Sequence, residues 1–218
     1  MKMFFQIFSF LIASITLSAQ EKDFSSFIPK GYDTLDQGVA RGDLNKDGLE
    51  DVVLALYNNW ESNENWMERD DAKMPKRLLI ILWGIQSGFK QAATSSNAIM
   101  CKRCGGVFGD PFSGVSISDN VLEIHHYGGS AWRWSYTHKF RFQNNNWFLI
   151  GKTSNSFWSV QDCEKLGDFA GTDYEDVNFI TGQYESKKIT EDCVLKENKK
   201  GKKKVLPLVS LTKFKIDN

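Results

Sequence analysis

Residues 132–142 read W-R-W-S-Y-T-H-K-F-R-F, and this stretch decides the fold class. Aromatic side chains and one histidine occupy every second position, while charged or hydroxyl side chains occupy the positions between them. Successive side chains of a β-strand point to opposite faces of a sheet, so the alternation predicts a strand. One face is expected to be wet, and the other is expected to be buried or to bear a ligand; the latter carries Trp132, Trp134, Tyr136, His138, Phe140 and Phe142.

The segments around this stretch also predict strands separated by tight turns. Gly128-Gly129-Ser130 precedes it and Asn144-Asn145-Asn146 follows it, and both tripeptides favour turns. Further strands are expected at residues 77–83, 115–117, 121–127 and 147–152, and from residue 89 onward. Strands joined in this way form an antiparallel meander. We therefore expect an all-β or β-dominated chain, with a meander or sandwich-like sheet in a single domain.

The chain is rich in tryptophan, with seven among 218 residues. Three of them, Trp83, Trp134 and Trp147, lie within expected strands and are predicted to belong to the core. Trp60 and Trp66 lie instead in a long polar segment, residues 58–76, where a core position is harder to justify. Because indole rings stack on sugars and on protein surfaces, these two are candidates for ligand contact. A loop that folds back over the sheet would explain them as well.

Residues 43–51, D-L-N-K-D-G-L-E-D, space oxygen atoms as a calcium ion requires them. Gly48 would allow the sharp turn that wraps the loop around one hard cation. The expected ligands are four side chains and one backbone carbonyl: Asp43, Asn45, Asp47, Asp51 and Leu49. The sequence therefore predicts Ca²⁺ as a stabilising ion.

The loop differs from an EF-hand, because Leu54 stands where a bidentate glutamate should close the site and a strand-like run follows. The pattern G-D-x-N-x-D-G-x-x-D before a strand resembles the calcium loops of FG-GAP and integrin-type propeller repeats, over residues 42–56. Residues 167–176 repeat the length and the ends of this loop. Ala170 and Thr172 replace its middle ligands, so a full propeller is not expected.

The first residues predict export. Lys2 precedes an apolar run that ends at Ser18-Ala19, which fits a cleaved signal peptide at 1–19 and a mature domain at 20–218. The run is shorter than a membrane span needs, so we expect a periplasmic or secreted protein that does not span the membrane. With 27 basic and 27 acidic residues, the chain loses only Lys2 with the leader, and the balance suggests no nucleic acid or anionic membrane as partner. A lysine cluster at residues 196–204 is interpreted as a solvated hairpin tip, with a polyanion site as the alternative.

Four cysteines remain after signal removal, and an exported compartment favours disulfides. Proximity favours Cys101 with Cys104 and Cys163 with Cys193, although three pairings are possible. Gly105-Gly106 directly follows the C-x-x-C motif and cannot open a stable helix, so a structural clip is favoured over a redox site. A zinc site would need every thiolate to stay reduced outside the cytoplasm.

No catalytic motif is complete. Gly128-Gly129-Ser130-Ala131-Trp132 lacks the last glycine of a serine-hydrolase elbow. His125 and His126 are neighbours in one strand and point to opposite faces, so one is expected in the core and one at the surface. Pairing of Tyr127 with Trp132 would place His138 opposite Val121, too far from His125 for a shared metal ion.

The middle of the chain, residues 101–150, carries a second resemblance. C-x-x-C-G-G, G-D-P-F, H-Y-G-G-S and R-W-S, ending in K-F-R-F, resemble exported bacterial envelope proteins without an assigned activity. This resemblance implies a location in the envelope and no activity.

These patterns together predict a non-enzymatic, calcium-stabilised binding or interaction module of the bacterial envelope, with a glycan or an envelope protein as ligand. One alternative is a hydrolase of cell-wall or extracellular polymer, with acids near Asp110 and His126 transferring protons. Another alternative is an inhibitor or immunity protein that plugs a partner's cleft with residues 58–76.

Overall fold

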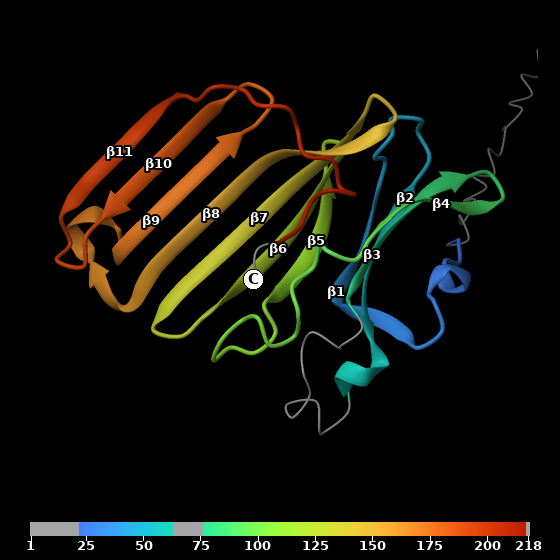
Figure 1. Ribbon diagram of the computed structural model, residues 1–218, viewed down its shortest axis with the longest axis horizontal. Helices are drawn as coiled ribbons and strands as arrows, with labels where there is room; N and C mark the ends of the chain where they lie inside the picture. Colours follow the sequence, from blue (N-terminus) through green and yellow to red (C-terminus); the bar gives the residue numbers. More distant parts are fainter. Residues whose placement is uncertain (1–21, 63–75, 217–218) are drawn as a thin grey trace, which may run out of the picture.

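Strands β2 (Asp51–Asn58) and β3 (Leu78–Ile85) are continuous apolar runs because they occupy the centre of a sheet that is covered on both faces. Strands β1 (Tyr32–Gly42) and β4 (Gly88–Ser95) flank them in an antiparallel sheet of order β1-β2-β3-β4 (Figure 1). The computed structural model describes residues 22–62 and 76–216. The expected signal peptide at 1–19 lies outside the described residues.

The second sheet has seven antiparallel strands in the order β11-β10-β9-β8-β7-β6-β5. Every neighbouring pair is also consecutive in sequence, so the expected meander and the β-dominated fold are confirmed. Its strands are β5 (Phe112–Ser118), β6 (Val121–Gly129), β7 (Trp132–Gln143), β8 (Asn146–Cys163), β9 (Asp168–Asn178), β10 (Gln183–Ile189) and β11 (Leu195–Lys202). Short 3-10 helices of the described residues lie outside the strands: η1 (Ser25–Phe27), η2 (Asn59–Ser62) and η5 (Glu164–Leu166).

The two sheets share one apolar core. Val53, Ile81, Ile124, Phe140 and Trp147 belong to a single buried cluster that draws on both sheets. The opposite face of the four-stranded sheet is also covered, because Phe24, Phe27 and Ile28 from the N-terminal segment pack on a second cluster around Leu54 and Leu82. One end of the seven-stranded sheet is therefore packed against the rest of the molecule, as in a sandwich.

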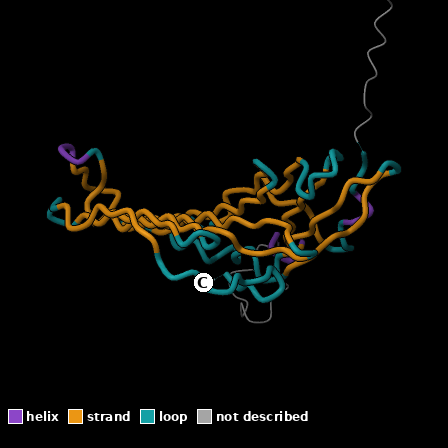
Figure 2. The backbone as a smooth tube through the Cα atoms, turned by 90° about the horizontal axis from the view of Figure 1, so that it is seen from above, coloured by secondary structure: helices purple, strands orange, loops and turns teal. Residues whose placement is uncertain are grey.

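The C-terminal segment, residues 203–216, crosses the packed face of the seven-stranded sheet. The Leu149 amide donates to the Val209 carbonyl at 2.9 Å, and the Leu211 amide donates to the Trp147 carbonyl at 2.9 Å. The Phe214 ring lies 5.1 Å from the rings of both His138 and Phe140. Figure 2 views the sheet nearly edge-on, with the C-terminal segment against one side. Strands β8 to β11 extend beyond this cover.

Both expected disulfides are present: Cys101 with Cys104, and Cys163 with Cys193. The second joins the end of β8 to the turn before β11, and its half-cystines pack with Ala170, Ile189 and Trp158 in a small cluster. This cluster lies at the end of the sheet remote from the shared core. The disulfide therefore fixes strands that the main core does not reach.

The β6–β7 register differs from the expectation. Gly129 pairs with Arg133, which places His138 opposite Ile124 rather than Val121, and His125 opposite Thr137. Three residues, 130–132, lie between the paired Gly129 and Arg133, whereas a pairing of Tyr127 with Trp132 would leave four, residues 128–131. As a result, His126 faces Tyr136 and lies on the same face as His138.

Two further expectations were wrong. The lysine cluster is not a hairpin tip, since Lys196, Lys199, Lys200 and Lys202 lie within the edge strand β11. Charged side chains on an edge strand disfavour pairing with another chain, which explains their position. Trp147 is 3% exposed and Trp83 packs on the core, but Trp134 is only partly buried and lies outside the core cluster.

Candidate binding groove and calcium loop

The loop at residues 43–51 joins β1 to β2 and folds as a tight turn. Gly48 has a backbone φ of +81°, which residues other than glycine rarely adopt, and Lys46 has φ +68°. Asn120, from the β5–β6 turn of the other sheet, donates its side-chain amide to the Asp43 carbonyl. The loop thus lies where the two sheets meet.

Backbone amides of the loop hold its carboxylates. Asp43 Oδ1 accepts from the Lys46 amide at 2.6 Å, and Asp43 Oδ2 accepts from the Gly48 amide at 3.0 Å. Asp47 Oδ1 accepts from the Leu49 amide at 2.8 Å. Asn45 donates its side-chain amide to Asp47 Oδ2 at 2.9 Å. The expected ligands therefore share one loop, but its side chains bind one another and the backbone.

Asp51 is the most deeply placed of the expected ligands and is fully buried. Its Oδ2 accepts from the Leu44 amide at 2.7 Å, and its Oδ1 accepts from the Gly84 amide at 2.8 Å. Burial is the main cause that raises the pKa of Asp51, with a smaller contribution from the Asp47 charge. Within the two described ranges, no three His, Cys, Asp or Glu side chains are grouped closely enough to hold a metal ion.

Of the two tryptophans expected to contact a ligand, Trp60 lies in η2 and is 54% exposed, whereas Trp66 lies outside the described residues. The residue after Trp60, Glu61, is buried and turns inward to Arg77. The position of Trp60 is thus fixed by an ion pair beside it.

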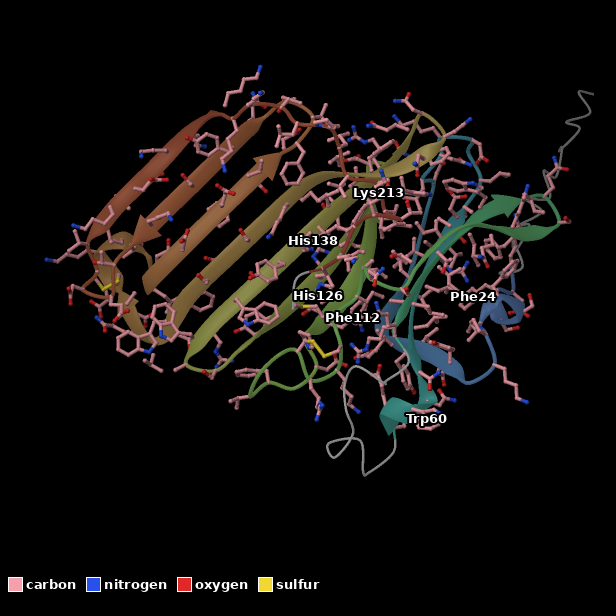
Figure 3. All side chains as sticks on the ribbon, in the orientation of Figure 1. Phe24, Trp60, Phe112, His126, His138 and Lys213 are labelled. Atoms are coloured by element: carbon pink, nitrogen blue, oxygen red, sulfur yellow. A yellow bond between two sulfur atoms is a disulfide. The ribbon has the colours of Figure 1, made fainter. Side chains whose placement is uncertain are left out.

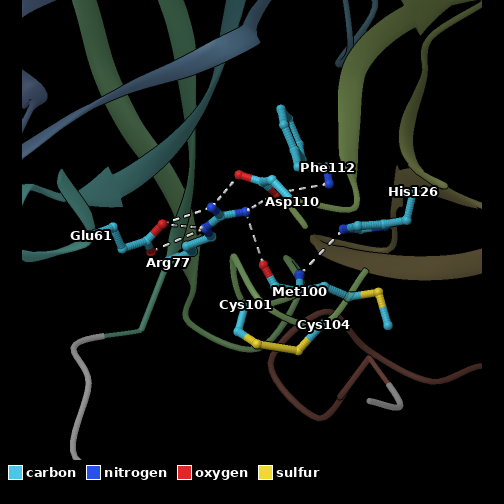
Figure 4. The surroundings of a disulfide bond; sticks show 8 residues. All are labelled: Glu61, Arg77, Met100, Cys101, Cys104, Asp110, Phe112 and His126. Carbon is cyan, nitrogen blue, oxygen red and sulfur yellow. Dashed lines mark hydrogen bonds and ion pairs between the residues drawn. A yellow bond between two sulfur atoms is a disulfide. The ribbon is translucent and has the colours of Figure 1, made fainter. Parts of the chain in front are cut away.

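Arg77 is the centre of a buried ion cluster (Figure 4). Its side chain is almost fully buried and binds Glu61 at 2.7 Å, Asp110 at 2.5 Å and the Met100 carbonyl at 3.1 Å. Burial alone would lower the pKa of Arg77, but the hydrogen bonds to Asp110 and Glu61 outweigh it and the pKa is raised. The cluster ties η2 and β3 to the segment that carries the Cys101–Cys104 disulfide.

Asp110 and His126, the residues of the hydrolase alternative, lie next to this ion cluster. Both carboxylate oxygens of Asp110 bind Arg77, and Oδ1 also accepts from the Phe112 amide at 3.0 Å. His126 is 1% exposed, and its Nε2 accepts from the Met100 amide at 3.2 Å. Burial, then the nearby His138 and Arg77 charges, lower the pKa of His126 to about 3. His126 is therefore too deeply buried to reach a bound polymer, and both oxygens of the exposed Asp110 are already bound to Arg77.

A further candidate site lies on the seven-stranded sheet, on the face of β7 that carries its even-numbered residues. Phe140 and His138 are buried at one end of this face, but Tyr136 and Trp134 are half-buried and Trp132 is 44% exposed. Trp134 and Tyr136 stack with ring centroids 5.2 Å apart. Gly128 makes room for this stack, because a Cβ at that position would lie 2.5 Å from the Trp134 ring.

Cross-strand neighbours of these aromatics form a polar row. Ser154 pairs with Tyr136 on one side and with Glu175 on the other, and Ser156 pairs with Trp134 and with Asp173. Together with residues of β10 and β11 they line a groove of about 400 Å³. Its lining comprises Tyr136, Lys152, Ser154, Asn155, Ser156, Asp173, Glu175, Ser186, Lys188 and Glu197.

Apart from Lys152, the charges within this groove are paired. Lys188 binds Asp173 at 3.0 Å, Lys203 binds Glu175, and Ser186 donates to Glu197 at 2.6 Å. Hydroxyl, carboxylate and ammonium groups are therefore held beside the stacked rings of Trp134 and Tyr136, which we call the aromatic platform. Such a surface offers both donors and acceptors to a polar ligand and a flat apolar face to its ring.

A second hollow, of about 420 Å³, adjoins the groove at Tyr136 and Lys152, which line both. Its other walls come from the C-terminal segment and β8, and Figure 3 shows Lys213 of that segment above the strand that carries His138. The Lys152 ammonium lies 4.7 Å from the centroid of the Tyr136 ring. The aromatic platform thus continues into a basic hollow.

Neither Trp60 nor any expected calcium ligand lines this groove. The alternation of residues 132–142 indicated that the face with Trp134 and Tyr136 is buried or bears a ligand, so the sequence predicted the aromatic side of the groove. The sequence did not predict the polar side of the groove, which is formed by residues of β8 to β11. A period-two signal exists there, since Lys152, Ser154, Ser156 and Trp158 occupy alternate positions, but serine and lysine are common on wet faces.

Comparison with family models, with curated proteins and with solved structures found no match to this chain. Within the described residues, no helix is long and apolar enough to cross a membrane.

Proposed function

We propose that this protein is an exported, non-enzymatic binding module that holds a glycan in the groove over β7 to β11. The observation that carries the proposal is the stacked pair Trp134 and Tyr136 beside a row of fixed polar groups. Sugar rings present apolar C–H faces and polar hydroxyl edges. The aromatic platform suits the faces, and Ser154, Ser156 and the paired charges suit the hydroxyls.

Several features favour binding over catalysis. The groove is open along a flat sheet, and of the residues of the hydrolase alternative Asp110 is bound by Arg77, while His126 is buried and accepts from the Met100 amide. A catalytic carboxyl pair would need a cleft in which one group is free to protonate the substrate. Two disulfides support a periplasmic or secreted location, which the expected signal peptide also implies.

Calcium is proposed as a stabilising ion of the loop at residues 43–51. Its support is the oxygen-rich pattern, the turn at Gly48, and the burial of Asp51 among backbone amides. Asp43, Asn45, Asp47 and Asp51, with the Leu49 carbonyl, would hold the ion. A divalent cation there would offset the repulsion among three carboxylates and anchor the start of β2.

Affinity electrophoresis through gels that contain a panel of polysaccharides tests the glycan proposal. The wild-type protein should be retarded by at least one polymer, and Tyr136→Ala should weaken that binding about tenfold through loss of ring stacking. Tyr174→Ala is the matched control, because Tyr174 pairs with Asn155 on the opposite face of the sheet. Retardation by no polymer, or equal loss in both variants, would contradict the proposal.

A further inference from the structure

The hollow that adjoins the glycan groove carries three lysines and no acid in its lining. Lys152 comes from β8, and Lys213 and Lys215 come from the C-terminal segment. Across the two described ranges, no acidic side chain forms an ion pair with any of the three. The neighbouring groove is different, because its Lys188 is paired with Asp173.

Ammonium groups that line one hollow without an acidic partner attract an anion. The two lysines of the C-terminal segment are exposed, and Lys152 is held over the Tyr136 ring at 4.7 Å. That contact places one charge at the end of the aromatic platform. A ligand held beside Tyr136 in the groove would therefore present its next substituent to the lysines.

We propose that this hollow is an anion subsite, and that the glycan bound in the groove is acidic, with a carboxylate or sulfate ester on its sugar rings. The inference rests on the proposed glycan function and specifies its ligand class. Lysine suits such groups as a flexible point charge with three donors. The other charges of the groove are paired, so the selection of acidic sugars falls to Lys152, which lines both sites, and to Lys213 and Lys215 of the hollow.

Two matched pairs of polymers test the subsite with the full exported protein. Polygalacturonate and its methyl ester differ by the carboxylate charge, and dextran sulfate and dextran differ by the sulfate esters. The charged member of at least one pair should bind at least tenfold more tightly than its neutral partner. Preference in the first pair alone assigns a uronate, preference in the second alone assigns a sulfate ester, and preference in both assigns an acidic polymer of either kind.

Removal of two lysines links the preference to this site. Lys213→Ala/Lys215→Ala should weaken binding of the charged polymer roughly tenfold and leave the affinity for a neutral glycan unchanged. Lys30→Ala/Lys90→Ala removes the same charge from exposed positions outside both hollows and is the control. Melting temperatures of both variants establish that each is folded.

Failure of this inference can be told from failure of the glycan function. Tyr136-dependent binding that is equal for charged and neutral polymers would overturn the anion subsite alone. An acidic preference that both double variants share equally would also overturn it. Absence of Tyr136-dependent binding to every polymer in the wider panel would overturn both.

Discussion

Tyr136 stands at the boundary between the packed and the open parts of one strand face. On one side it stacks on Trp134, and on the other its ring lies 6.1 Å from the buried His138. Lys152 covers it from the neighbouring strand. A single side chain therefore joins the core, the aromatic platform and the basic hollow, which is why its replacement is the sharpest probe of binding.

His126 should make the protein less stable in acid. Its folded pKa, about 3, lies below the ordinary histidine value near 6.5, so the unfolded chain binds the proton more readily. Its contribution to stability is full above about pH 6.5 and is lost as the pH falls towards 3, at up to about 1.4 kcal/mol per pH unit. Thermal melts between pH 7.5 and 4.5 would measure this loss.

The variant His126→Gln separates this effect from general acid denaturation. Glutamine can still accept from the Met100 amide but does not titrate, so its melting temperature should fall less steeply with pH than that of the wild type. The paired change His125→Gln, at a partly exposed position, should leave the slope as it is. Parallel pH profiles for wild type and His126→Gln would rule out the buried histidine as the cause.

Loss of Arg77 should be costly. Arg77→Met leaves the 5% exposed Glu61 without its cation, and breaking a buried ion pair in this way costs about 3 to 5 kcal/mol. Lys200→Met breaks an exposed pair with Glu185 and should cost less than about 1 kcal/mol. Urea unfolding of both variants gives the comparison. Similar small losses in the two would mean that water reaches the Arg77 cluster.

At the scale of elements, strands that contact the core were predictable and strands beyond it were not. The alternation in β7 and the apolar runs of β3 and β6 follow directly from burial of one or both faces. Strands β9, β10 and β11 have wet residues on both faces, so their sequences carry no apolar period. They form because β8 continues past the core and offers them an edge.

The disulfide at the far end of these strands should contribute more to stability than the short clip. Cys163 and Cys193 are 30 residues apart in sequence, whereas Cys101 and Cys104 are 3 apart. In the chain-entropy model, closing these loops constrains the unfolded chain by about 4 and about 2 kcal/mol, respectively. Urea melts of the two double serine variants should rank in that order, and the reverse rank would show that the clip supports the Arg77 cluster more strongly than loop entropy suggests.

At the scale of the whole molecule, the candidate calcium loop, residues 43–51, lies at the junction of the two sheets, so the proposed ion should act on global stability. Binding to the native state alone adds about 2.7 kcal/mol at a hundredfold excess over Kd. The melting temperature should rise with added calcium and fall with chelator, and magnesium should substitute poorly because it demands tighter octahedral geometry.

Asp47→Ala is the matched variant for this prediction. It removes one expected ligand whose contacts lie within the loop, so it should abolish the difference between calcium and chelator without loss of the fold. A wild-type melt that is identical in saturating calcium and in chelator would contradict the stabilising role. Titration calorimetry without a binding signal would contradict the site itself.

The binding groove could be predicted only in part. The sequence indicated that the aromatic face of residues 132–142 is buried or ligand-bearing, but not that its packing changes between His138 and Tyr136. That change depends on where the C-terminal segment crosses, and Phe214 covers His138 from a position 76 residues along the chain. The same crossing of the C-terminal segment places Lys213 and Lys215 in one hollow with Lys152, and no local sequence pattern predicts this arrangement.

Covalent footprinting of the full protein, with and without the polysaccharide that retards it, tests the central claim most directly. A carbene reagent labels accessible side chains, so a bound glycan should protect Tyr136, Lys152 and Lys213, which line the groove and the adjoining hollow, from modification. Labelling of Trp60 and of Tyr174 should stay unchanged, since neither side chain lines the groove. Protection at Trp60 with none at Tyr136 would place the ligand on the other sheet and contradict the account.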